Sequence, residues 1–217
     1  MDITFLLTAA VHIDTFQTLM DALAPDLQVQ YIVDESLLED ARNHGLTAEL
    51  QQRIEQLITP ISHDSKVLVC TCSTIGGLVE RQHPVNGCHL QRIDRAMADY
   101  SIANARHILV LAALASTLGP TEQLLQQSAA ALGKTADIDY QLIDGAWDCF
   151  VAGDRQAYEQ LIRDAITRQQ YDYDLILLAQ ASMAGAVTHE TFNIPVVTSP
   201  ELGVRQAIAT VRSFTGR

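Results

Sequence analysis

The stretch Lys66-Val67-Leu68-Val69-Cys70-Thr71-Cys72-Ser73-Thr74-Ile75-Gly76-Gly77 decides how the rest of the chain can fold. It opens with an uninterrupted aliphatic run, which predicts a strand buried on both faces. The small polar residues and glycines that follow predict the turn that leads this strand into a helix. In an open parallel sheet, ligands bind beyond the carboxyl ends of the strands. Cys72 is therefore placed where chemistry is usually done, and amides at a helix start favour its thiolate.

The composition limits the classes of protein to consider. The chain has 217 residues, of which 48% are apolar, enough for one large domain or two small ones. We expect no membrane span and no signal peptide, because no apolar run approaches about 18 residues and no basic segment opens the chain. The net charge of −12 argues against nucleic-acid binding. We therefore expect a cytoplasmic protein with a small-molecule ligand, which can be anionic where amides make a pocket locally positive.

The cysteines and histidines form no metal-binding or redox motif. Cys70, Cys72, Cys88 and Cys149 make no CxxC pair, and the seven histidines have no HxxxH or HExxH spacing. No glycine-rich nucleotide motif occurs either. We expect reduced thiols, no metal and no cofactor, with Cys70 in the core, Cys88 and Cys149 as structural residues and Cys72 as the functional thiol.

Strands and helices are predicted to alternate along the whole chain, which is typical of an α/β protein with parallel sheet. The expected helix N-caps are Asp14, Thr47, Asp94 and Asp154. The predicted strands are residues 3–7, 28–33, 66–70, 89–93, 108–112, 138–143, 175–179 and 194–198.

The second half of the chain repeats the pattern of the first. A shift of 108 positions aligns Cys72 with Gln180, Thr74 with Ser182, and Thr8 with Ser116. This repeat predicts two similar α/β half-domains, with small-residue turns on both sides of one active site.

Five segments resemble the aspartate/glutamate/hydantoin racemase superfamily, and the resemblance covers nearly the whole chain. Cys72-Ser73-Thr74 is similar to the family's Cys-Asn-Thr, and 178–183 is similar to its Leu-Gly-Cys followed by small residues. The segments 92–97, 108–111 and 116–121 look like the family's middle part.

The resemblance implies two pseudo-symmetric, flavodoxin-like half-domains with parallel sheets and the active site between them. The expected domains are residues 1–95 plus 199–217, and residues 96–198. It further implies a cofactor-independent amino-acid racemase or related isomerase that acts at the α-carbon of a small carboxylate, with a homodimer as one option. Cys72 and Gln180 occupy the two catalytic positions. The expected substrate-binding residues are Thr8, Ser73, Thr74, Ser116, Thr117, Ser182 and Met183; helix capping is the alternative for each hydroxyl.

The sequence departs from the family at the second catalytic cysteine. In the family, one thiolate removes the α-proton and a second thiol protonates the opposite face. Gln180 stands at the second position, and an amide does not titrate near neutrality. Three alternatives remain open: His12 or His189 supplies the second proton; the reaction is a decarboxylation, cis-trans isomerisation or lyase step that needs one thiol; or the protein is a non-catalytic binder. A relative with one cysteine, arylmalonate decarboxylase, carries it in the other half.

Two arginines add a further alternative. Arg92 and Arg95 could pair with a substrate carboxylate through their two-pronged guanidinium groups. The alternative for both is an arginine in solvent or at an interface.

Overall fold

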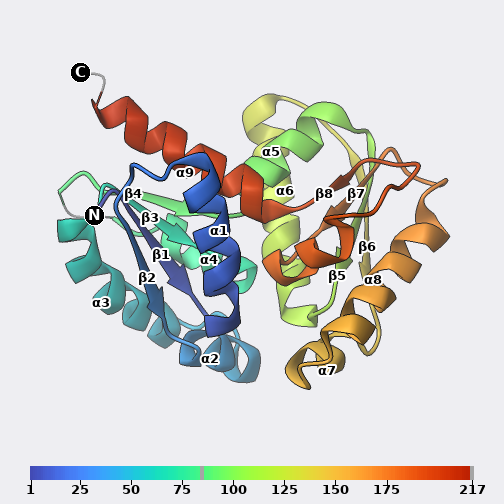
Figure 1. Ribbon diagram of the computed structural model, residues 1–217, viewed down its shortest axis with the longest axis horizontal. Coiled ribbons are helices and arrows are strands. Elements are labelled where there is room, and N and C mark those ends of the chain that lie inside the picture. Colours follow the sequence, from blue (N-terminus) through green and yellow to red (C-terminus); the bar gives the residue numbers. More distant parts are fainter. Residues whose placement is uncertain (84–85, 216–217) are drawn as a thin grey trace. The chain divides into compact units, whose positions relative to one another are not determined.

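The computed structural model describes residues 1–83 and 86–215 (Figure 1). Strands in this part of the chain form two four-stranded sheets in which all neighbouring strands are parallel. Helices connect the strands, so the predicted α/β class is confirmed. None of the described helices combines the length and the apolar character that a membrane crossing requires.

The chain divides into two compact units. Unit 1 comprises Met1–Asp94 and Pro200–Arg217, and unit 2 comprises Arg95–Ser199. These bounds differ by one residue from those expected from the sequence.

Unit 1 contains the sheet β2-β1-β3-β4. Its strands are β1 (Ile3–Leu7), β2 (Val29–Val33), β3 (Val67–Cys70) and β4 (His89–Arg92). Its helices are η1 (Ala10–His12), α1 (Ile13–Leu23), α2 (Ser36–His44), α3 (Ala48–Asp64), α4 (Ser73–Glu80) and most of α9 (Ser199–Thr215). Every residue of β3 is buried, as expected for a central strand covered on both faces.

Apolar side chains on both faces hold the unit 1 sheet. On one face, Leu6 and Leu68 share a buried cluster with residues of α2, α3 and α4 such as Leu37, Ile54 and Ile75. On the other face, the ring of Phe5 stacks on the ring of Phe16 in α1, with ring centroids 5.2 Å apart.

Unit 2 repeats this plan with the sheet β6-β5-β7-β8. Its strands are β5 (His107–Ala112), β6 (Asp137–Leu142), β7 (Leu175–Leu178) and β8 (Val196–Val197). Its helices are α5 (Arg95–Asn104), η2 (Ala115–Thr117), α6 (Leu118–Leu132), α7 (Ala146–Val151), α8 (Arg155–Gln169) and η3 (Ala181–Val187).

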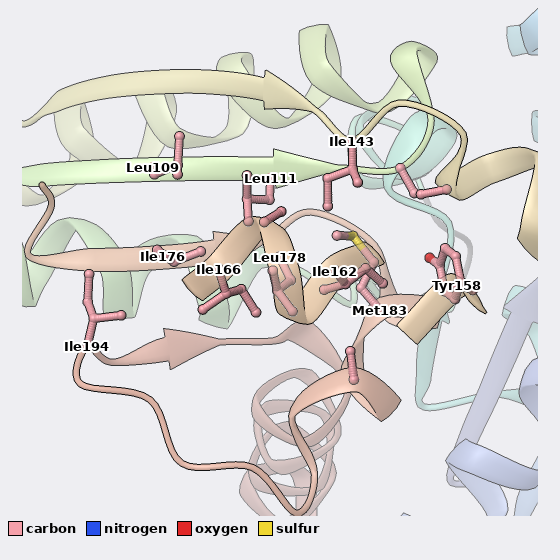
Figure 2. Close-up of a cluster of buried hydrophobic side chains, with 14 residues drawn as sticks. Leu109, Leu111, Ile143, Tyr158, Ile162, Ile166, Ile176, Leu178, Met183 and Ile194 are labelled. Atoms are coloured by element: carbon pink, nitrogen blue, oxygen red, sulfur yellow. The ribbon is translucent and has the colours of Figure 1, made fainter. Parts of the chain in front are cut away.

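Figure 2 shows the apolar cluster that covers one face of the unit 2 sheet. Leu111 of β5 and Leu178 of β7 lie against Ile162 and Ile166 of α8. Met183 of η3 belongs to the same cluster and is fully buried. The core strands β5 and β7 therefore pack against α8 through one continuous apolar cluster.

Several local predictions need correction. Asp14 does not cap a helix, since α1 begins at Ile13 after η1. Thr47 and Asp154 do cap, by accepting the N–H groups of Leu50 and Ala157. The last strand is shorter than predicted, Val196–Val197, and α7 was not predicted.

Helix α9 is attached to unit 1 through an unusually close backbone contact. A Cβ atom added at Gly203 would lie 2.1 Å from the carbonyl oxygen of Ile93. The Gly203 carbonyl also accepts a hydrogen bond of 3.0 Å from the buried Gln91 side chain. Only glycine allows this helix to lie so close to the end of β4.

We predict that G203A destabilises the protein by about 3 kcal/mol, because backbone must move to admit the methyl group. Denaturant unfolding followed by circular dichroism measures this loss. G119A is the matched control: it also adds a methyl group to a helix, but into open space. We expect it to be neutral or stabilising by up to about 1 kcal/mol. Equal effects of the two substitutions would show that the contact with Ile93 is unimportant.

Candidate active site

Cys72 lies between the end of β3 and the first residue of α4. Its backbone is extended, with φ −95° and ψ 114°, and its carbonyl accepts the Gly76 N–H at 2.9 Å as the first bond of the helix. Its side chain is partly exposed and packs on one side against the apolar cluster of unit 1. A thiol with one free side is compatible with the predicted reactive role.

Thr71, the residue before Cys72, is hydrogen-bonded to β1. The carbonyl oxygen of Leu6 accepts both the N–H and the hydroxyl of Thr71, at 3.0 and 3.2 Å. Leu6 pairs with Cys70 in the sheet, so Thr8 and Cys72 each lie two residues beyond a paired position. The structure therefore brings Thr8, Cys72, Ser73 and Thr74 to the same carboxyl edge of unit 1, where Thr8, Ser73 and Thr74 are buried.

A buried ion pair supports the turn from β4. The Arg92 guanidinium donates to both carboxylate oxygens of Asp94, at 2.6 and 2.8 Å, and to the Ser73 carbonyl at 3.2 Å. The two side chains are 3% and 1% exposed. Burial disfavours the charge of Arg92, but the adjacent Asp94 carboxylate outweighs it and raises the arginine pKa. Arg92 is therefore not in solvent, and its pairing with Asp94 and Ser73 favours a structural role over a substrate contact.

Gly76 and Gly77 have a packing role rather than a role in the turn. They lie inside α4, and a Cβ at Gly76 would be 3.0 Å from the Cβ of Arg92. The missing side chains let the arginine lie against the first turn of α4.

The other cysteines are less accessible than Cys72, except for Cys149. Cys70 and Cys88 are buried, as predicted, and Cys149 is partly buried. Burial raises the pKa of the Cys70 thiol, which donates to the Cys72 carbonyl at 3.7 Å. Cys70 therefore stays protonated at neutral pH and serves as a structural residue.

Gln180 occupies the corresponding turn of unit 2, between β7 and η3. Its side-chain oxygen accepts the N–H groups of Ala113 and Leu114, at 2.7 and 3.1 Å. Both lone pairs of this oxygen are thus used, and the amide nitrogen remains as the donor. Sequence reasoning did not foresee this contact, since it depends on where the chain beyond β5 turns. The catalytic role of Gln180 stays a prediction.

The strand register corrects the predicted repeat. Leu6 pairs with Cys70 in unit 1, and Leu111 pairs with Leu178 in unit 2. The shift from Cys70 to Leu178 is 108 residues, as predicted, but from Leu6 to Leu111 it is 105 residues. Ala113, not Ser116, is therefore the counterpart of Thr8.

The remaining predicted residues of unit 2 differ in their surroundings. The Ser182 hydroxyl is 2.8 Å from that of the buried Tyr158, a partner that sequence analysis missed. Met183 lies in the core, which favours a packing role over the expected substrate contact. Thr117 is buried and Ser116 is partly exposed at η2.

The two histidines considered as proton donors lie in different surroundings. His12 is partly buried before α1, and burial lowers its pKa, so its neutral form is favoured at pH 7. His189 is exposed. Among the described residues, no group of three or more histidine, cysteine or acidic side chains could hold a metal ion.

Comparison of the sequence with family models and with curated proteins finds no match. Solved structures are similar over nearly the whole chain. An aspartate racemase from Picrophilus torridus matches with TM-score 0.70 and 15% identity over 98% of this chain and 95% of its own. Allantoin racemase from Klebsiella pneumoniae matches with TM-score 0.68 and 17% identity over 99% and 89%. This chain has the racemase fold. A mutant of arylmalonate decarboxylase shares the racemase fold at TM-score 0.60 and 14% identity over 98% and 94%.

We predict that D94N lowers the free energy of unfolding by about 3–5 kcal/mol, because Arg92 is left as a buried charge without its partner. Urea unfolding of wild type and variant at the same pH measures the change.

The double variant R92M/D94L is the control, since it removes both charges and keeps apolar volume. We expect it to recover most of the lost stability. A loss below about 1 kcal/mol in D94N would mean that the pair resembles an exposed salt bridge and does not support the turn.

Proposed function

We propose that the protein is a cofactor-independent enzyme that transfers a proton at the α-carbon of a small carboxylate, such as an amino acid or a derivative. The observation that carries this proposal is the partly exposed Cys72 at the carboxyl edge of a racemase fold. The names of the similar structures, aspartate and allantoin racemases, support the same class of reaction. A cytoplasmic homodimer is part of this proposal.

In the proposed reaction, the Cys72 thiolate takes the α-proton and becomes a thiol. The electron pair of the C–H bond moves into the carboxylate, which becomes a dianionic enolate. Thr8, Ser73 and Thr74 would donate hydrogen bonds to this group. Delivery of a solvent proton to the other face, with loss of the Cys72 proton to solvent, completes an isomerisation. Exchange of the Cys72 proton with solvent and its return to the same face gives hydrogen exchange alone.

A second candidate function, a decarboxylase with one thiol, is favoured by the environment of Gln180. Its oxygen is occupied by two backbone N–H groups, and its amide carries no proton that titrates near neutrality. In this reaction the substrate loses CO₂, the electron pair stays on the α-carbon, and the Cys72 thiol protonates it. Water then restores the thiol. The similarity to arylmalonate decarboxylase supports this alternative.

We predict that the protein exchanges the α-hydrogen of a carboxylate substrate with solvent deuterium, and that C72S lowers the rate by about 100-fold or more. Proton NMR in D₂O measures the exchange for both enantiomers of aspartate and glutamate. Release of CO₂ from an arylmalonate tests the second candidate.

C149S is the matched control, because it also changes a partly exposed cysteine and lies outside the proposed site. We expect it to react like wild type. Exchange or CO₂ release that persists at the wild-type rate in C72S would refute a role for this thiol, and the absence of both reactions in wild type would favour a binding protein.

A further inference from the structure

The turns beyond β1 and β5 are similar in backbone but differ in what their N–H groups bind. After β5, the N–H groups of Ala113 and Leu114 point at one oxygen, Oε1 of Gln180. The distances of 2.7 and 3.1 Å are those of good hydrogen bonds. This backbone therefore has the geometry to hold one oxygen atom by two amides.

Unit 1 has a similar turn at residues shifted by 105 positions. The short helices η1 (Ala10–His12) and η2 (Ala115–Thr117) correspond, and the helices that follow begin at Ile13 and Leu118. The residues before them, Ala9 and Leu114, are both extended, with φ/ψ of −158°/126° and −122°/124°. Thr8 and Ala9 thus correspond to Ala113 and Leu114.

The N–H groups of Thr8 and Ala9 have no hydrogen-bond acceptor within residues 1–83 and 86–215. Cys72 stands where unit 2 has Gln180, and its side chain ends at the sulfur. The carboxamide of Gln180 therefore has no counterpart in unit 1. Backbone donors without a protein acceptor bind water or a ligand.

We propose that Thr8 N–H and Ala9 N–H form an oxygen-binding pair that holds one oxygen of the substrate carboxylate beside Cys72. A carboxylate has the shape of the carboxamide that fills the corresponding pair in unit 2, and its charge strengthens both hydrogen bonds. The inference rests on the proposed function and names which groups hold the acid. It also makes the two turns unequal: the turn of unit 1 is open to a ligand, while that of unit 2 is closed by Gln180.

The proposed position of the carboxylate also explains how the Thr8 and Ala9 N–H groups would stabilise the charge that forms during proton removal. When the α-proton leaves, negative charge builds up on the carboxylate oxygens. Two N–H groups that already point at one of these oxygens stabilise that charge without reorganisation. Cys72 precedes α4 as Gln180 precedes η3, so the thiol and the N–H pair share the carboxyl edge of unit 1, and a carboxylate held by the pair has its α-carbon near the thiol.

Amide NMR with malonate as the probe tests the pair directly. We expect the Thr8 and Ala9 amide protons to move downfield on malonate addition and to respond much less to malonamide, which lacks the charge. The amides of Ala113 and Leu114 should not respond in wild type. They should respond in Q180A, which removes their acceptor, and not in Q180E, which keeps an oxygen at the same place.

The outcomes separate this inference from the proposed function. Malonate shifts at Ser73 and Thr74 without shifts at Thr8 and Ala9 would overturn the oxygen-binding pair and leave a carboxylate-binding enzyme in place. Malonate shifts at Thr8 and Ala9, with deuterium exchange that is unaffected by C72S, would support the pair and refute the thiol chemistry. No response of any unit 1 amide would overturn the inference.

Discussion

Backbone N–H groups that follow the last paired residue of a parallel strand need a hydrogen-bond acceptor. The acceptor that each group finds distinguishes the turns at the carboxyl edges of the two sheets. Thr71, just beyond β3, satisfies this need by donating to Leu6 of the neighbouring strand. The donors beyond β5 satisfy it with the side chain of Gln180. The donors beyond β1 do not satisfy it within the described residues, and this difference is the basis for proposing a ligand at the turn of unit 1.

The position of Cys72 depends on groups buried beneath its turn. Arg92 is held by Asp94 in the interior and binds the Ser73 carbonyl, while Gly76 leaves space for it against α4. A buried ion pair is weak evidence for high stability, since burying both charges is costly. The two-pronged pairing of Arg92 with Asp94 orients the guanidinium that binds the Ser73 carbonyl, and so fixes the start of α4.

The sequence predicted the elements that periodicity determines and missed contacts that depend on distant residues. The aliphatic run before Cys72 correctly indicated a central strand, because only a strand covered on both faces tolerates it. Gly76 and Gly77 were assigned to a turn, because their contact with Arg92 comes from another strand. The uniform shift of 108 misplaced the counterpart of Thr8, since the connections within the two halves differ in length. The contact of Gln180 with Ala113 could not be foreseen for a related reason: periodicity does not show where a side chain meets a turn from another strand.

The central claim is that a reactive thiol at Cys72 lies beside donors that hold a carboxylate. Alkylation by iodoacetate and by iodoacetamide, followed by peptide mass spectrometry, tests it most directly, with Cys149 as the internal reference for a partly exposed thiol. A charged hydrogen bond contributes about 1.5 kcal/mol or more, so we predict that Cys72 prefers iodoacetate by about tenfold relative to Cys149. The same preference at both cysteines, or no alkylation of Cys72, would contradict the claim.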